Sequence, residues 1–118
     1  MGTGVGGSSG GQGSFNVGIG KSALSAVTTG VYNVAIGTSA ADALLAGACN
    51  IALGVGALGA SQGAHNNIAL GVDAMGAVVT GNTNIAIGYR TADAMTSGTV
   101  NIATVSYTHL TLPTICSV

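Results

Sequence analysis

One short stretch recurs every 17 residues and constrains this chain more than any other feature of its sequence. The stretch begins with asparagine and reads Asn-Val-Ala-Ile-Gly or a close variant of it. Its copies begin at Asn16, Asn33, Asn50, Asn67 and Asn84. A further copy begins at the next interval, at position 101, and is not completed. A fixed period of this length is typical of solenoids, in which each repeat forms one structural unit.

The start of each unit has the alternation of a β-strand. We number the positions of a unit from 1, its asparagine, to 17; positions 2 and 4 carry Val, Ile or Leu, and position 3 carries Ala or Gly. Residues two apart share one face of a strand. We predict that the side chains at positions 2 and 4 point into the core and that position 3 points outward. The residues at position 4 are Ile19, Ile36, Leu53, Leu70 and Ile87. Ile36→Asp is then predicted to unfold the stack, because it would bury an unpaired charge.

Two polar or small positions frame this strand. Position 5 is always glycine, as Gly20, Gly37, Gly54, Gly71 and Gly88. We expect it to end the strand at a turn with positive φ, a conformation that glycine adopts without steric cost. The asparagine at position 1 tolerates left-handed conformations and can hydrogen-bond the turn backbone. If the units stack, the five asparagine side chains also form a ladder.

The rest of each unit is less regular. Residues 22–26, 40–45 and 91–95 are rich in Ala, Leu, Ser or Met. They are too short for an independent helix, so one helical turn per unit and a second short strand both remain open. A unit with one clear strand buries its apolar face only by stacking on the next unit. The predicted fold class is therefore all-β, a parallel β-solenoid or β-roll of five 17-residue coils.

The repeat divides the chain into three regions. Residues 1–12 are rich in Gly and Ser and are predicted to be a flexible leader, and the solenoid is predicted to span residues 13–103. Residues 104–118 lack the repeat pattern. They are either a capping segment, since terminal repeats are atypical, or a non-native end. Their string Val-Ser-Tyr-Thr-His-Leu-Thr-Leu-Pro-Thr resembles a terminus found on many unrelated proteins from draft assemblies.

Charge and hydropathy exclude further classes. The chain has two basic and three acidic residues, too few for the basic footprint of a nucleic-acid-binding protein. No signal peptide is expected, because a Gly/Ser run follows Met1. Residues 43–60 are long and apolar enough to suggest a membrane span. The repeat explains this segment better, since neighbouring units carry charged or polar residues at equivalent positions.

No catalytic, cofactor-binding or metal-binding residues are predicted. Gly54–Gly59 fits the pattern GxGxxG, but a dinucleotide site would also need a long helix there, and the other units follow the same plan without these glycines. His65 and His109 have no acidic or cysteine partner at useful spacing. Cys49 and Cys116 lack the spacing of a zinc site. These residues are therefore interpreted as structural or solvent-facing.

The repeat resembles that of a group of fibrous proteins. Asn-Val-Ala-Ile-Gly and Asn-Ile-Ala-Ile-Gly, followed by an Ala-containing segment and Thr-Gly, are similar to repeats of phage tail fibres and tail spikes. They are also similar to the head repeats of YadA-like trimeric autotransporter adhesins. The resemblance covers residues 13–103. It implies a homotrimer that acts as a shaft or adhesive head on a virion tail or a cell surface, and no catalysis. The receptor is not implied.

Two other functions fit a solenoid. An ice-binding β-solenoid would need a regular array such as Thr at one repeat position, but position 14 is irregular. It reads Thr29, Ala46, Gly63, Thr80 and Ser97. A left-handed β-helix acyltransferase has a hexapeptide pattern, which the 17-residue unit does not match. Both alternatives are weaker than the adhesive role.

Overall fold

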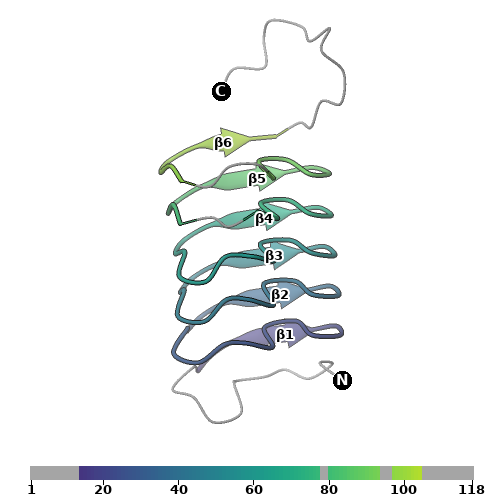
Figure 1. Cartoon of the computed structure of the whole chain (residues 1–118), viewed down its shortest axis with the longest axis vertical. Helices are drawn as coiled ribbons and strands as arrows, with labels where there is room; N and C mark the ends of the chain where they lie inside the picture. The colour runs from purple at the N-terminus through teal and green to yellow at the C-terminus, as the bar shows by residue number, and fades with distance from the viewer. Residues whose placement is uncertain (1–13, 78–79, 94–96, 105–118) are drawn as a thin grey trace, which may run out of the picture.

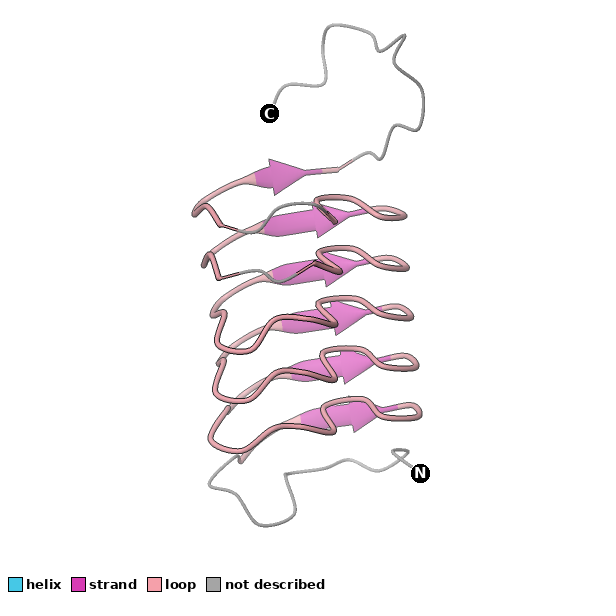
Figure 2. Ribbon diagram, in the orientation of Figure 1, coloured by secondary structure: helices cyan, strands magenta, loops and turns pink. Residues whose placement is uncertain are grey.

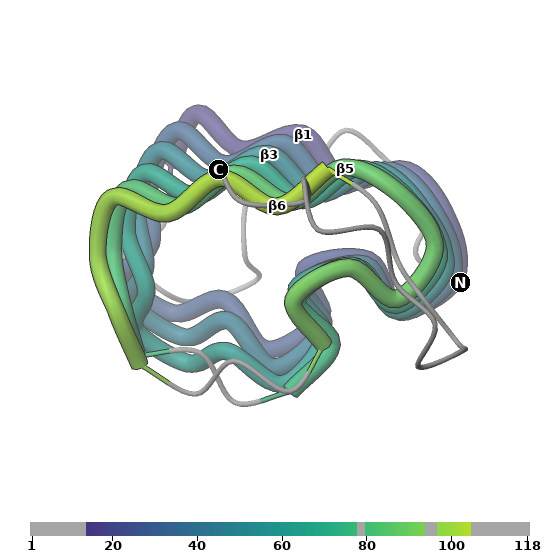
Figure 3. The backbone as a smooth tube through the Cα atoms, turned by 90° about the horizontal axis from the view of Figure 1, so that it is seen from above, coloured from purple at the N-terminus to yellow at the C-terminus, as the bar shows by residue number. Residues whose placement is uncertain are grey.

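In the part of the chain that the structure describes, six short parallel strands stack into one sheet. The computed structural model describes residues 14–77, 80–93 and 97–104. Within these residues the strands are β1 (Val17–Ile19), β2 (Val34–Ile36), β3 (Ile51–Leu53), β4 (Ile68–Leu70), β5 (Ile85–Ile87) and β6 (Ile102–Ala103). Each pairs with the next in sequence, in the order β1-β2-β3-β4-β5-β6 (Figure 1). The chain makes one full coil between consecutive strands (Figures 1 and 3). The predicted all-β parallel β-solenoid is thus confirmed.

The register of the sheet is set by the repeat. Val34 pairs with Val17 on one side and with Ile51 on the other, and the same 17-residue offset holds up to the pairing of β5 with β6. Each coil therefore rises by one strand spacing, about 4.8 Å. Residues at the same repeat position consequently form columns along the solenoid. Strands occupy one side of the coil, and loops and turns form the rest (Figure 2).

The predicted orientation of the strand side chains is wrong. The residue at position 3 is buried in every strand from β1 to β5. Ala35, Ala52, Ala69 and Ala86 have no exposed surface. In contrast, Ile36 and Ile87 at position 4 are 40% and 42% exposed. The small residue thus points into the coil, and the large apolar residues on either side of it point outward.

A narrow interior explains this reversal. A Cβ atom added to Gly18 would lie 3.6 Å from both Cβ and Cδ1 of Leu24, which reaches across the coil from position 9. Position 3 therefore has room for a hydrogen or a methyl group. Larger buried side chains come from positions 9 and 12. Where the residue at one of these two positions is small, the residue at the other is larger. The pairs at these positions are Leu24 with Val27, Ala41 with Leu44, and Leu58 with Ser61.

Tight turns occupy the part of each unit for which a helical turn or a second strand was expected. Neither element is present in the described residues of positions 6–14. Positions 7 and 9 instead have left-handed backbones, as at Ser22 (φ 62°) and Leu24 (φ 53°). This strain costs about 1–2 kcal/mol at a non-glycine residue. Bonds between coils offset it, such as that from Leu24 N to Ala40 O (3.1 Å). Figure 3 shows the backbone folding back toward the strand at this point.

The residues that frame the strand differ from expectation in one respect. The glycines at position 5 have φ between +124° and +132°, which confirms the predicted positive-φ turn. The left-handed residue at the other end is not the asparagine. It is the residue before it, as at Tyr32 (φ 58°) and Cys49 (φ 59°). Asparagine is therefore required for its hydrogen bonds and not for its backbone conformation.

The apolar segment 43–60 contains turns and β3. Among the residues that the structure describes, no helix is long and apolar enough to cross a membrane.

Candidate functional site

The buried asparagines form the predicted ladder. The Oδ1 of Asn50 accepts hydrogen bonds from the backbone N of Asn67 (2.9 Å) and from its Nδ2 (3.4 Å). The Nδ2 of Asn50 donates to Oδ1 of Asn33 (3.0 Å) and to the carbonyl of Ala64 (2.7 Å). The backbone N of each asparagine from Asn33 to Asn101 donates to the Oδ1 of the asparagine one coil earlier. Each side chain thus links two coils and the turn of its own coil.

This ladder is structural. Asn33, Asn50, Asn67 and Asn84 are at most 1% exposed, so they offer no surface to a ligand. Over the described ranges, every buried side-chain nitrogen or oxygen has a hydrogen-bond partner. The most regular residues of the repeat therefore hold the coils together, and any recognition must use other positions.

The outer surface of the sheet is one candidate site, and we call it the apolar face. It consists of the outward side chains at positions 2 and 4 of β1 to β5. These are Val17, Ile19, Val34, Ile36, Ile51, Leu53, Ile68, Leu70, Ile85 and Ile87. All ten are aliphatic, and all are half-buried or exposed. Because the strands pair in register, these side chains form two continuous apolar columns.

Further apolar side chains border this face. Phe15 and Tyr32, at position 17 of successive units, stack with their ring centroids 5.0 Å apart and their planes 7° apart. Position 6, on the other border, carries exposed Val55, Val72 and Tyr89 in the later coils. Single exposed apolar residues are ordinary, whereas a contiguous patch marks an interaction surface.

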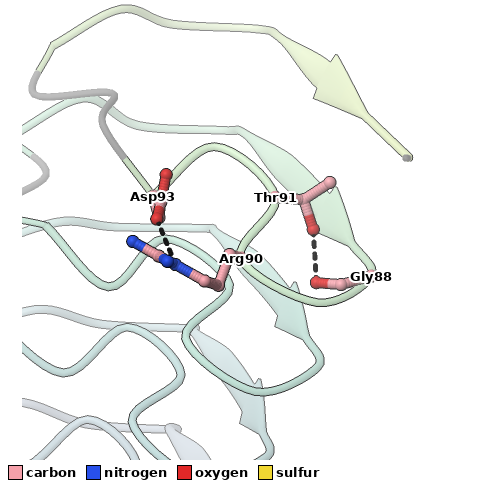
Figure 4. A network of polar contacts seen from close by, with 4 residues as sticks. All are labelled: Gly88, Arg90, Thr91 and Asp93. Carbon is pink, nitrogen blue, oxygen red and sulfur yellow. Dashed lines mark hydrogen bonds and ion pairs between the residues drawn. The ribbon is translucent and has the colours of Figure 1, made fainter. Parts of the chain in front are cut away.

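A polar hollow lies on the turns of the last two complete units. Asp73, Gly76, Ala77, Arg90 and Asp93 line a volume of about 280 Å³. The Nε of Arg90 donates to Oδ2 of Asp93 at 2.8 Å (Figure 4). This hydrogen bond is the main cause that raises the pKa of Arg90, followed by the charge of Asp93, so the guanidinium stays protonated.

A buried threonine supports the turn that carries this ion pair. Thr91 occupies position 8, where the four preceding units have alanine. Its Oγ1 donates to the carbonyl of Gly88 at 2.5 Å (Figure 4). The backbone N of Arg90 also donates to Val72 O in the coil below (2.8 Å). These two hydrogen bonds therefore fix the turn around Arg90, one within the same coil and one to the preceding coil.

The remaining sequence candidates are not brought together. The described residues contain no group of three or more His, Cys, Asp or Glu side chains that could hold a metal ion. His65 is exposed, and its Nδ1 accepts a hydrogen bond from Ala48 N (3.1 Å). Cys49 is a free, exposed thiol. His109 and Cys116 lie outside the described residues. Gly54–Gly59 follows β3 and consists of a bend and a turn, without a helix.

Comparisons of the chain with protein-family models, curated proteins and solved structures gave no match. The function of this chain is therefore inferred from its geometry and from the resemblance of its repeat.

Proposed function

We propose that this chain is a structural and adhesive repeat segment of a phage tail fibre or a bacterial surface adhesin. In this role it contributes to attachment from a virion tail or a cell surface, as a homotrimer. The observation that carries the proposal is the apolar face, two columns of aliphatic side chains that point to solvent in a single copy. Covering these side chains lowers the free energy of the chain by about 25 cal/mol per Å² of apolar area removed from water.

A second copy of the same chain fits this face best. The side-chain rows recur with the strand spacing of about 4.8 Å. A copy that runs in the same direction presents rows with the same spacing, so every coil finds an equivalent partner at its own height. The face carries no charged residue that would oppose such a contact.

Three copies satisfy this geometry through cyclic symmetry. Position 2 and position 4 form separate columns, so each copy can meet one neighbour with each column. Contacts of this head-to-tail kind close into a ring when the rotation between copies allows it. The resulting trimer has its axis along the stack of coils, and its turns and hollows remain at the outside. This arrangement suits a shaft whose outer loops contact a surface.

The oligomeric state tests the proposal directly. By sedimentation equilibrium, the full chain of 11.2 kDa is expected to have a mass of about 34 kDa. Ile36→Asp places a charge on the apolar face and is expected to weaken association at least tenfold, because covering an isoleucine is worth about 1.5–3 kcal/mol. Gln62→Asp adds the same charge at an exposed position away from this face and should leave the mass unchanged.

A cross-linking variant covers the case in which Ile36→Asp does not fold. Val34→Cys/Ile36→Cys, in a chain whose two native cysteines are replaced by serine, should form an interchain disulfide on mild oxidation, because the position-4 column of one copy meets the position-2 column of the next. Gln62→Cys in the same background should not. A wild-type chain that stays monomeric at all concentrations, together with equal cross-linking in both variants, would contradict the trimer.

A further inference from the structure

Charge is scarce in this chain and is concentrated at one place. The sequence has five charged residues in total. Three of them, Asp73, Arg90 and Asp93, line the polar hollow described above. The Arg90 and Asp93 side chains are exposed by 56% and 30%, and an ion pair with this exposure contributes little to stability. Stability therefore does not explain why the charges gather here.

The repeat builds this hollow from two coils. Asp73 and Arg90 share position 7 of successive units, so their backbones lie about 4.8 Å apart in one column. Gly56 occupies the same position one coil earlier, and its missing side chain leaves the space that the Asp73 carboxylate fills. Gly76 lies at position 10, one coil before Asp93, and thus opens the floor of the hollow. The two glycines therefore leave space beside the charged side chains of the next coil.

The charges are mixed in sign, and this decides the class of ligand. The positive charge of the guanidinium repels a metal ion, and the negative charges of the two carboxylates repel an anion. A hydroxyl group both donates and accepts hydrogen bonds, so adjacent hydroxyls can donate to a carboxylate and accept from a guanidinium. Hydrogen bonds of this charge-assisted kind are about twice as strong as neutral ones. Arg90 has five N–H donors, and its bond to Asp93 uses one of them.

An aromatic side chain borders the same turn. Tyr89 directly precedes Arg90 in the chain and is 58% exposed. Its ring offers an apolar surface beside the charged groups. The apolar side of a sugar ring packs on such a surface, while the hydroxyls of the ring reach the carboxylates and the guanidinium.

We propose that the hollow formed by Asp73, Arg90 and Asp93, with Tyr89 beside it, is a binding site for a neutral saccharide. This inference rests on the proposed adhesive role and names the class of its ligand. Its three charged residues lie on the turns, away from the apolar face on the strand side of the coil. Failure of saccharide binding with an intact trimer would therefore reject this site and leave the assembly standing.

Saturation-transfer difference NMR of the full chain tests the site, with lactose, maltose, cellobiose and sucrose as neutral probes. At least one probe is expected to receive saturation from the protein. Arg90→Gln/Asp93→Asn should weaken its binding at least tenfold, which is the effect of losing a charge-assisted hydrogen bond. Backbone amide shifts of residues 89–93 should move on addition of the probe to the unmodified chain and not to the variant.

The two charges outside the hollow provide a matched control. Lys21→Gln/Asp42→Asn also removes one positive and one negative charge from exposed or half-buried side chains. This variant should bind the probe as the unmodified chain does. The proposal is overturned if no neutral probe receives saturation, if the Arg90/Asp93 variant retains full binding, or if only charged probes such as sialyllactose or spermidine bind. Circular dichroism of both variants establishes that they are folded.

Discussion

Gly54→Ala is expected to lower the free energy of unfolding by at least about 3 kcal/mol, the sum of backbone strain and overpacking. Gly54 has φ +132°, which L-residues rarely adopt. A Cβ atom at this position would also lie 2.6 Å from the carbonyl carbon and oxygen of Gly71 in the next coil. These are backbone atoms, so relief requires the two coils to move apart and the hydrogen bond from Gly71 N to Leu53 O (2.7 Å) to lengthen.

Gly63→Ala is the matched control in the same unit. A Cβ atom at Gly63 meets no atom within 4 Å, and its φ is not in the left-handed range. This substitution is expected to change the free energy of unfolding by no more than about 1 kcal/mol. The change is a gain if alanine reduces the conformational entropy of the unfolded chain. Urea denaturation followed by circular dichroism measures both variants. Equal midpoints would mean that the glycines at position 5 do not meet between coils.

The architecture follows from the sequence because one period controls it. A fixed interval of 17 residues dictates parallel pairing and register together, since equivalent strands can stack only in one way. The position-5 glycine and the asparagine ladder could also be predicted, because each of these residue types has a specific backbone or hydrogen-bonding role. These parts depend on local chemistry, which repeats with the sequence.

The direction of the strand side chains could not be obtained from hydrophobicity. Alternation shows that positions 2 and 4 share a face, but it does not show which face is inside. Assigning the larger apolar residues to the core assumes that the outer face of the sheet stays in contact with water. Here the interior is filled from positions 9 and 12, by residues such as Leu44 and Leu58. The invariably small residue at position 3, as at Ala52, was the signal that the interior lies on its side.

The polar hollow was missed for a related reason. Asp73 and Arg90 are 17 residues apart and share position 7, so the repeat register places them in one column. This signal is present in the sequence. The contribution of Asp93 is harder to predict, because it depends on the left-handed turns that bring positions 7 and 10 together. Such turns, made by non-glycine residues, have no clear sequence pattern.

Asn50→Leu is expected to lower the free energy of unfolding by about 4 kcal/mol. The substitution leaves the Asn67 N–H and the Ala64 carbonyl without their partners, inside a part of the coil that water does not reach. Each buried group that loses its hydrogen bond costs about 1–3 kcal/mol. Leucine also replaces an amide packed at 1% exposure by a branched side chain of different shape. The measurement is a urea titration followed by circular dichroism.

Asn101→Leu separates the effect of burial from the loss of the ladder hydrogen bonds themselves. Asn101 occupies the same repeat position, and its N and Nδ2 both donate to Asn84 Oδ1 (3.0 and 2.9 Å), but it is exposed. Because water can replace the hydrogen bonds of Asn101, this variant should lower the free energy of unfolding by no more than about 1 kcal/mol. Similar losses for Asn50→Leu and Asn101→Leu would contradict the assignment of the loss to buried groups that lack partners. A large difference would show that burial makes the hydrogen bonds of the ladder costly to lose.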